Sequence, residues 1–231
     1  LLLLRARVRC DLDDTVGARK EWQAAIAAPE KAADPDALRL SAAELAIELG
    51  DVPAAEQLLG QISADAGESG VAHVFRGRIA CERGDAASMI EAYRGAVAAM
   101  PGKKPALLQE LAQRLVRLGK WAEGAAVFEE VGVQALPSMA HVDYARALLG
   151  AHQLERLSSL VADVADDPQA PDWKLQAAAE LSVRRGDLGT AVALLGRFQR
   201  RHPESVEVAY HLARRLLELR QPAAAKVYLD S

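Results

Sequence analysis

The sequence is poor in the residues that build most chemical sites. It contains no asparagine, only 4% aromatic residues, and two cysteines, Cys10 and Cys81. Without asparagine there is no acceptor for N-glycosylation. The two cysteines form neither a CxxC pair nor a metal-binding spacing. No run of about 18 apolar residues is present, so we expect no direct insertion into a membrane.

The motifs of catalysis are also missing. Five histidines are scattered along the chain, and none belongs to an HExxH pattern. The PGKKP segment at residues 101–105 contains Gly-Lys but lacks the GxxxxGK[ST] frame of a phosphate-binding loop. There is no GxSxG motif and no glycine-rich dinucleotide turn. We therefore expect no enzyme activity, no metal site and no cofactor.

The charge excludes another class of partner. The formal net charge is −4 and the sequence pI is about 5.8, with basic and acidic residues interleaved along the chain. A nucleic-acid-binding surface needs clustered lysine and arginine, so we expect no nucleic-acid partner. RNA binding by a related helical repeat stays open as a minor alternative. The 51% hydrophobic content, with abundant alanine and leucine, favours closely packed helices.

What the chain does contain is a repeat. Residues 76–101 predict two short helices joined at Gly84-Asp85, where glycine can end one helix and aspartate can cap the next. The same turn is expected at Asp13-Asp14, Gly50-Asp51, Gly119-Lys120, His152-Gln153, Gly186-Asp187 and Arg220-Gln221. The first residues of successive turns are 37, 34, 35, 33, 34 and 34 apart, close to the tetratricopeptide period of about 34.

The second helix of each repeat carries the clearest family pattern. The A-x3-F part of the tetratricopeptide motif is matched by Ala18-x3-Trp22, Ala55-x3-Leu59, Met89-x3-Tyr93, Gly124-x3-Phe128 and Ala191-x3-Leu195. The W-x2-L-G-x2-Y part is approached only at Leu108 to Leu115 and Ala209 to Leu216. The chain therefore resembles a tetratricopeptide or tetratricopeptide-like helical repeat protein.

The resemblance implies an all-α fold, a right-handed α-solenoid of about seven helix-turn-helix repeats. We expect residues 1–231 to form a single array, with repeats at about 1–33, 36–63, 70–101, 104–136, 138–168, 172–203 and 204–231. The sequence begins without methionine and inside an expected helix, so we expect it to be a piece of a longer protein. Packed helices lie about 8 to 10 Å apart, so Cys10 and Cys81, two repeats apart, are expected to be free thiols.

In tetratricopeptide proteins the first helices line a concave groove that receives a peptide or a helix. Carried onto this sequence, the resemblance places arginine-rich and apolar rows in that groove, which would suit an amphipathic or partly acidic segment. The alternative is that the apolar row packs between adjacent helices. The asparagines of the family's two-carboxylate clamp are missing, which argues against binding of chaperone tails. The expected partner-binding residues are Phe75, Arg78, Gln113, Arg146, Trp173, Tyr210 and Arg214.

The acidic segment ADVADDPQAPD, residues 162–172, has two readings. Its prolines predict that the preceding helix ends near Ala165 and that a mobile loop follows. The acidic residues could contact a basic partner or a cation, but a solvated linker is the simpler interpretation.

The leading functional hypothesis is a non-catalytic, bacterial protein-protein interaction scaffold. Its partner would be a protein or peptide, or another domain of the same chain. The alternative is an accessory segment of a larger bacterial enzyme or export machine, such as a glycosyltransferase, a sulfotransferase or an exopolysaccharide secretion protein. The sequence leaves the bacterial cytoplasm and the periplasm open as locations.

Overall fold

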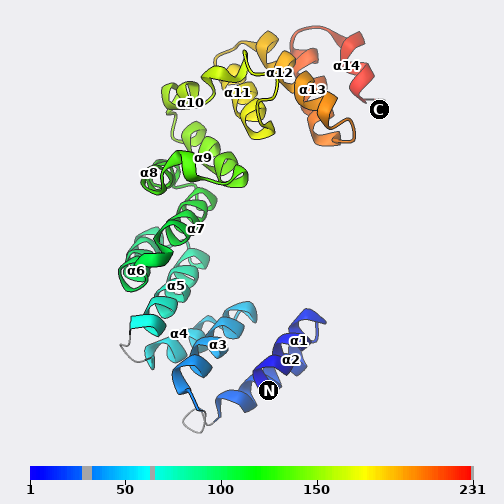
Figure 1. The fold of residues 1–231 in the computed structure, drawn as a ribbon. Helices are drawn as coiled ribbons and strands as arrows, with labels where there is room; N and C mark the ends of the chain where they lie inside the picture. The colour runs from blue at the N-terminus through cyan, green and yellow to red at the C-terminus, as the bar shows by residue number, and fades with distance from the viewer. Residues whose placement is uncertain (28–32, 63–65, 230–231) are drawn as a thin grey trace. The chain divides into compact units, whose positions relative to one another are not determined.

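The structure, a computed structural model, describes residues 1–27, 33–62 and 66–229, and the described residues contain helices but no strand (Figure 1). The all-α prediction is confirmed. Among these residues the α-helices are α1 (Leu2–Asp11), α2 (Thr15–Ile26), α3 (Pro35–Glu48), α4 (Val52–Gly60), α5 (Ala66–Glu82), α6 (Ala86–Ala99), α7 (Lys104–Arg117), α8 (Trp121–Val131), α9 (Ser138–Gly150), α10 (Leu154–Leu160), α11 (Asp172–Arg184), α12 (Leu188–Arg201), α13 (Val206–Glu218) and α14 (Pro222–Leu229).

Short 3-10 helices follow three of these α-helices, at η2 (Pro101–Lys103), η3 (Val133–Ala135) and η4 (Ala162–Val164). The chain divides into two compact units, residues 1–114 and 115–231, which we call the first and second units. The division falls within α7. The expected single array across both units stays a prediction. The expected repeat boundaries at 63 and 231 lie outside the described residues.

Each helical hairpin turns at a residue with left-handed backbone. Glycine occupies four of these turns, and the φ angle there lies between 71° and 78°. At the turn of α5 and α6, the N–H of Asp85 donates to the carbonyl of Ala80 at 2.9 Å, which closes the end of α5. The same bond, from the residue after the turn to the carbonyl five residues earlier, closes all seven turns. These are the seven turns predicted from the repeat, at residues 13, 50, 84, 119, 152, 186 and 220.

The residue after the turn starts the next helix. Asp14, Asp51, Asp85 and Asp187 each accept a hydrogen bond from a backbone N–H in the first turn of the helix that follows. An aspartate in this position satisfies one of the N–H groups that have no partner inside the helix. Lys120 and Gln153 provide no such side-chain bond. The aspartate caps expected from the sequence are therefore present where aspartate follows the turn.

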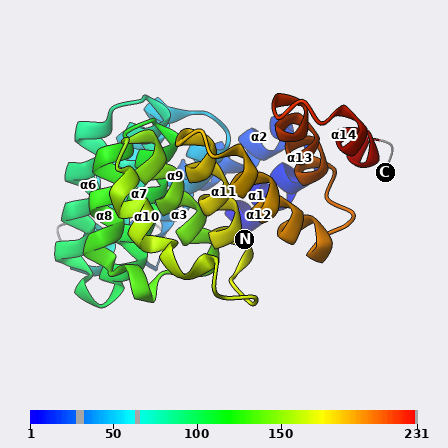
Figure 2. The ribbon, with the colours of Figure 1, turned by 90° about the horizontal axis from the view of Figure 1, so that it is seen from above.

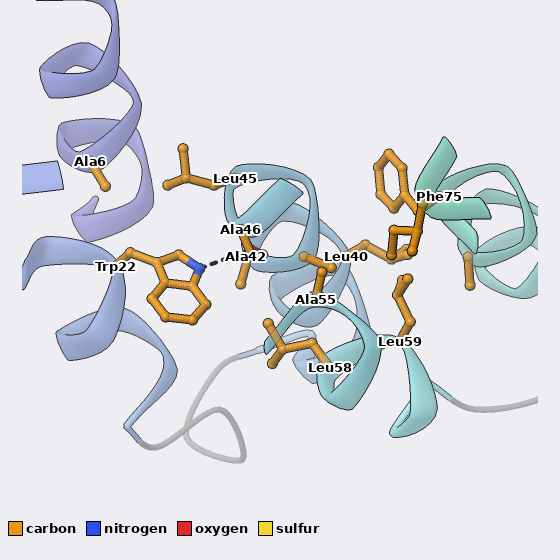
Figure 3. Packing of buried hydrophobic residues seen from close by; sticks show 13 residues of the cluster. Ala6, Trp22, Leu40, Ala42, Leu45, Ala46, Ala55, Leu58, Leu59 and Phe75 are labelled. Atoms are coloured by element: carbon orange, nitrogen blue, oxygen red, sulfur yellow. Dashed lines mark hydrogen bonds between the residues drawn. The ribbon is translucent and has the colours of Figure 1, made fainter. Parts of the chain in front are cut away.

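The first unit has a core built from α1 to α5 (Figure 3). Small alanines let the helices approach closely, while Trp22 and the leucines fill the space between them. Trp22 is only 4% exposed, and its indole N–H donates to the carbonyl of Ala42 at 2.8 Å. These contacts make Trp22 a residue of the core.

In the second unit, consecutive helices again pack in pairs. α9 packs against α8, α10 and α11, while α12 packs against α11 and α13. The views agree in placing α9 and α11 side by side (Figure 1 and Figure 2). Leu212, Leu216 and Ala225 form a small core between α13 and α14. This arrangement leaves surfaces of α9, α11 and α13 available to form a site together.

The cysteines and two properties of the described residues complete the description of the fold. Cys10 is partly exposed and Cys81 is buried, and both thiols are free, as predicted. Among the described residues, no helix is both long enough and apolar enough to cross a membrane. Within that same part of the chain, no cluster of histidine, cysteine, aspartate or glutamate has the arrangement of a metal site.

Candidate functional site

The predicted binding residues of the first unit are engaged within the chain. Phe75 on α5 is only 6% exposed and belongs to the core with Leu40 and Leu59 (Figure 3). The expectation that Phe75 is exposed to a partner is therefore wrong. The physical reason is that α3 and α4 pack against α5 and cover this face of the helix.

Arg78 lies directly beside this core and is held by internal contacts. Its guanidinium donates to Glu110 on α7 at 3.0 Å and lies 5.6 Å from the centre of the Phe75 ring. Arg114 donates to the same oxygen of Glu110 at 2.8 Å. Burial raises the pKa of Glu110, but the hydrogen bonds from Arg78 and Arg114 and the positive charge of Arg78 outweigh it and hold that pKa below its ordinary value. Gln113, one turn from Glu110, is half-buried.

The second unit contains a groove of about 450 Å³. Its lining comes from α9, α11 and α13, with Trp121 added from the start of α8 and Leu195 from α12. A volume of this size falls within the range of ligand-binding pockets, about 300 to 1,000 Å³. The lining residues are Trp121, Val142, Ala145, Arg146, Leu149, Gly150, Trp173, Gln176, Ala177, Ala179, Glu180, Val183, Arg184, Leu195, Glu207, Val208, His211 and Arg215.

Two half-exposed tryptophans belong to this lining. The Trp173 ring at the start of α11 stacks on His141 of α9, with 4.4 Å between ring centroids and 16° between planes. The indole of Trp121 lies against Gly150 at the end of α9, so close that a Cβ on Gly150 would be only 2.4 Å from the ring. Residue 150 must therefore be glycine for Trp121 to occupy this position. Half-exposed indoles on a groove wall are the side chains that most often anchor a protein partner.

The arginines of the groove are neutralised by neighbouring acids on their own helices. Arg146 pairs with Asp143 at 3.3 Å, and Arg184 pairs with Glu180 at 3.3 Å. Arg215 pairs with Glu218 at 2.8 Å. Glu207, at the start of α13, is exposed and has no cation of the described residues within ion-pair distance. It is thus the only carboxylate of the described lining that has no counterion.

The structure brings together some of the predicted residues of the second unit and leaves others out. Arg146 and Trp173 line this groove, whereas Tyr210 and Arg214 do not. The lining residues of α13 are Glu207, Val208, His211 and Arg215, of which His211 and Arg215 each follow a predicted residue by one position. One residue along a helix is a rotation of about 100°. The turn at Arg220 lies where the sequence predicted it, so α13 faces the groove with a different side from the one that carries Tyr210 and Arg214. Tyr210 is 56% exposed, on a face of α13 outside the groove.

Sequence reasoning also missed Trp121. It was overlooked because it lies in a second helix, whereas the prediction considered only first helices. The useful signal was its position two residues after the left-handed Gly119, where the second helix has only begun and still lies next to the first.

A network of arginines fixes the chain segment that leads into Trp173. Arg197 on α12 donates to the carbonyls of Val164 and Asp167, at 2.7 and 2.5 Å. Arg201, one helical turn later, donates to the carbonyls of Pro168 and Ala170, both at 2.6 Å. We call residues 164–170 the clamped segment. Guanidinium donors are the strong class of hydrogen-bond donors, so this backbone is held firmly.

The same network continues into the start of α11. Asp172 accepts from Arg201 at 3.0 Å and lies 2.7 Å from Nε2 of His202. Lys174, the residue that follows Trp173 on α11, pairs with Asp163 at 2.6 Å. The expectation of a mobile loop after α10 is therefore corrected, because hydrogen bonds hold the backbone of residues 164–170. The side chains of residues 162–172 are mostly exposed, as the interpretation as a solvated linker expects. α10 also ends at Leu160, earlier than the expected end near Ala165.

Comparison with known proteins leaves the family undefined. No protein-family model matches the chain, and no curated protein matches its sequence. A solved structure with a similar fold is that of PilW, described as a "widely conserved type IV pilus biogenesis factor". The two share 15% sequence identity and a TM-score of 0.54, over 86% of this chain and 93% of the other. At this identity the similarity shows the fold alone, a helical repeat fold.

Proposed function

We propose that the chain is a non-catalytic protein-interaction scaffold and that the groove of the second unit receives a segment of its partner. The observation that carries this proposal is the pair of half-exposed indoles, Trp121 and Trp173, in a groove of about 450 Å³. Exposing two such side chains to water costs free energy in the absence of a ligand, and covering them on binding recovers it.

The composition of the groove supports recognition over catalysis. Its apolar lining consists of aliphatic, alanine and tryptophan side chains, and its arginines are engaged in ion pairs within their own helices. A catalytic site would need an acid, base or nucleophile placed in a hydrogen-bonded constellation around a reacting atom. The groove lining offers no such constellation among its described residues.

The fold similarity supports the same proposal. PilW is described as a biogenesis factor for type IV pili, and its fold is similar to that of this chain. We extend this to the present chain as a role in bringing proteins together, in a bacterial cell. The expected alternative, an accessory segment of a larger enzyme or export machine, uses the same groove and differs only in what lies elsewhere in the protein.

The proposal can be tested with a displayed library of random peptides of about 16 residues, selected on the 231-residue chain. Gln176→Trp adds bulk at a lining position and should abolish binding of the selected peptides. Met139→Trp is the matched control, because Met139 is 74% exposed on α9 but lies outside the lining. Selected peptides that bind both variants equally would overturn the groove as the site.

A further inference from the structure

His202 lies beside the first turns of two helices that line the groove. It directly follows α12, and its ring packs against Phe198 with 4.8 Å between ring centroids. Trp173 is the second residue of α11 and Glu207 is the second residue of α13, and both belong to the groove lining. Both helices thus contribute to the groove from their first turns onward.

Both ring nitrogens of His202 face a carboxylate. Nε2 lies 2.7 Å from Oδ2 of Asp172, the first residue of α11. Nδ1 lies 3.7 Å from Oε1 of Glu204, two residues before the start of α13. Among the described residues, the other charged group of this ion-pair cluster is Arg201, whose guanidinium lies 3.0 Å from Oδ1 of Asp172. His202 therefore stands between the chain segments that begin α11 and α13.

The number of protons on the ring decides how many of these carboxylates it can bind. A neutral imidazole has one N–H donor and one acceptor nitrogen, whereas an ionised carboxylate only accepts. The neutral ring can donate to Asp172 through Nε2, and Nδ1 then turns a lone pair toward Glu204. The imidazolium ion has an N–H on each nitrogen and attracts both carboxylates. A proton on His202 therefore adds a connection to the segment before α13, and histidine is the side chain that ordinarily changes charge between about pH 5 and 8.

This added connection concerns two of the helices that a ligand would touch. α11 contributes Trp173 to the groove and α13 contributes Val208, which lies one helical turn after Glu204. A ligand that contacts both helices binds more tightly when their first turns are already held together, because less conformational freedom is lost on binding. The linkage is reciprocal, so a ligand that binds the protonated form better also causes the chain to take up protons.

We propose that the groove of the second unit is regulated by pH through His202, and that protonation of this ring raises the affinity of the groove for its partner segment. The Glu204 side chain is 76% exposed, so the added contact belongs to the class of exposed ion pairs. Such pairs change an equilibrium constant by up to about fivefold. We therefore expect binding to be about threefold tighter at about pH 5.5 than at about pH 8. This inference rests on the proposed function, since it describes the regulation of the same groove.

The test measures binding of peptides from the displayed library to the 231-residue chain by fluorescence anisotropy. The probes are N-acetylated peptides that lack histidine and are blocked by Gln176→Trp, so that the peptide itself does not titrate in this range. Their dissociation constant should be about threefold lower at about pH 5.5 than at about pH 8. His202→Gln keeps an amide donor for Asp172 but cannot take up a proton, so it should remove this difference. The matched control His73→Gln, on α5 in the first unit, should keep it.

The reciprocal effect provides a second measurement. Isothermal calorimetry in two buffers of different ionisation enthalpy should show proton uptake on binding at about pH 6.5. Glu204→Gln changes only an exposed side chain, so this variant should fold, and it should reduce the proton uptake. His141 and His211 adjoin the groove and are also histidines, so His141→Gln and His211→Gln identify the ring that titrates. Both of these variants should preserve the pH dependence of binding.

Three results would overturn the inference. The affinity could be the same or weaker at about pH 5.5, His202→Gln could keep the difference, or His141→Gln or His211→Gln could remove it. In those cases, library peptides that are blocked by Gln176→Trp would still support the scaffold function. A library without groove-dependent binders would refute the scaffold function, and with it the regulation by His202.

Discussion

Arg201 provides the sharpest test of how the segment before Trp173 is held. Replacing Arg201 by methionine keeps most of the side-chain length but removes two hydrogen bonds to the carbonyls of Pro168 and Ala170, and the ion pair with Asp172. A hydrogen bond from a charged donor contributes about 1.5 to 3 kcal/mol. The Arg201 side chain is 30% exposed, so water compensates part of this loss. We expect Arg201→Met to destabilise the second unit by about 2 kcal/mol.

The neighbouring residue supplies the control. Arg200 is exposed on the same helix and makes no hydrogen bond or ion pair with the described residues, so Arg200→Met should change stability by less than about 0.5 kcal/mol. Hydrogen exchange of the backbone amides is the appropriate assay, because it reports on each segment separately in a chain with two units. Arg201→Met should increase exchange in the clamped segment and at the start of α11. If both variants left exchange there unchanged, the clamp would not hold this segment.

Three further predictions concern the turns and the carboxylates of Asp172 and Glu110. His152 has a left-handed backbone with φ of 56°, so His152→Gly should raise the unfolding free energy by about 0.5 to 1 kcal/mol. Gly186 has the same backbone conformation, so Gly186→Ala should lower the unfolding free energy by about 1 kcal/mol, and urea titrations measure both changes. Burial raises the pKa of Asp172, but hydrogen bonds from His202 and Arg201 outweigh it and depress that pKa. The stability that the Asp172 carboxylate contributes is therefore complete above the unfolded pKa of about 4 and is lost as the pH falls through the lower folded pKa. Asp172→Asn should remove this loss and flatten the acid side of the curve of unfolding free energy against pH. Glu110→Gln should cost about 2 kcal/mol, because it leaves two guanidiniums without their carboxylate, and an unchanged urea midpoint would contradict the cluster's role.

The repeat could be predicted because its determinants are local. A left-handed residue followed by a helix cap has a recognisable sequence when the pair is Gly-Asp, as at Gly84 and Gly186. Once these turns were placed, the constant spacing located the less typical ones, including His152 and Arg220, where no glycine is present. The turns and the second-helix pattern therefore followed from the sequence with little help from tertiary structure.

The binding surface was less predictable, because it depends on contacts between helices. Phe75 and Arg78 occupy the same helical face that the sequence suggested, but α3, α4 and Glu110 of α7 engage that face. α13 faces the groove with the side that carries His211, not with the side that carries Tyr210. The periodicity of a helix defines its buried stripe well but defines its edges only to within about one residue, and groove residues lie at those edges.

The acidic segment before α11 shows a second limit of sequence reasoning. Its composition is that of a loop, and its acidic side chains do lie mostly at the surface. What holds it in place are its backbone carbonyls, which accept from Arg197 and Arg201 more than 25 residues later. Carbonyls are present at every residue, so a sequence gives no sign of which ones an arginine will reach.

The central claim, that a partner segment covers both indoles of the groove, can be measured directly by fluorine NMR of the chain labelled with 5-fluorotryptophan. The sequence has three tryptophans, so three signals are expected: Trp22 from the core of the first unit, and Trp121 and Trp173 from the groove. Titration with a selected peptide should shift the Trp121 and Trp173 signals together, with one dissociation constant, while the Trp22 signal stays in place. Saturating binding that leaves Trp121 and Trp173 unshifted would contradict the account.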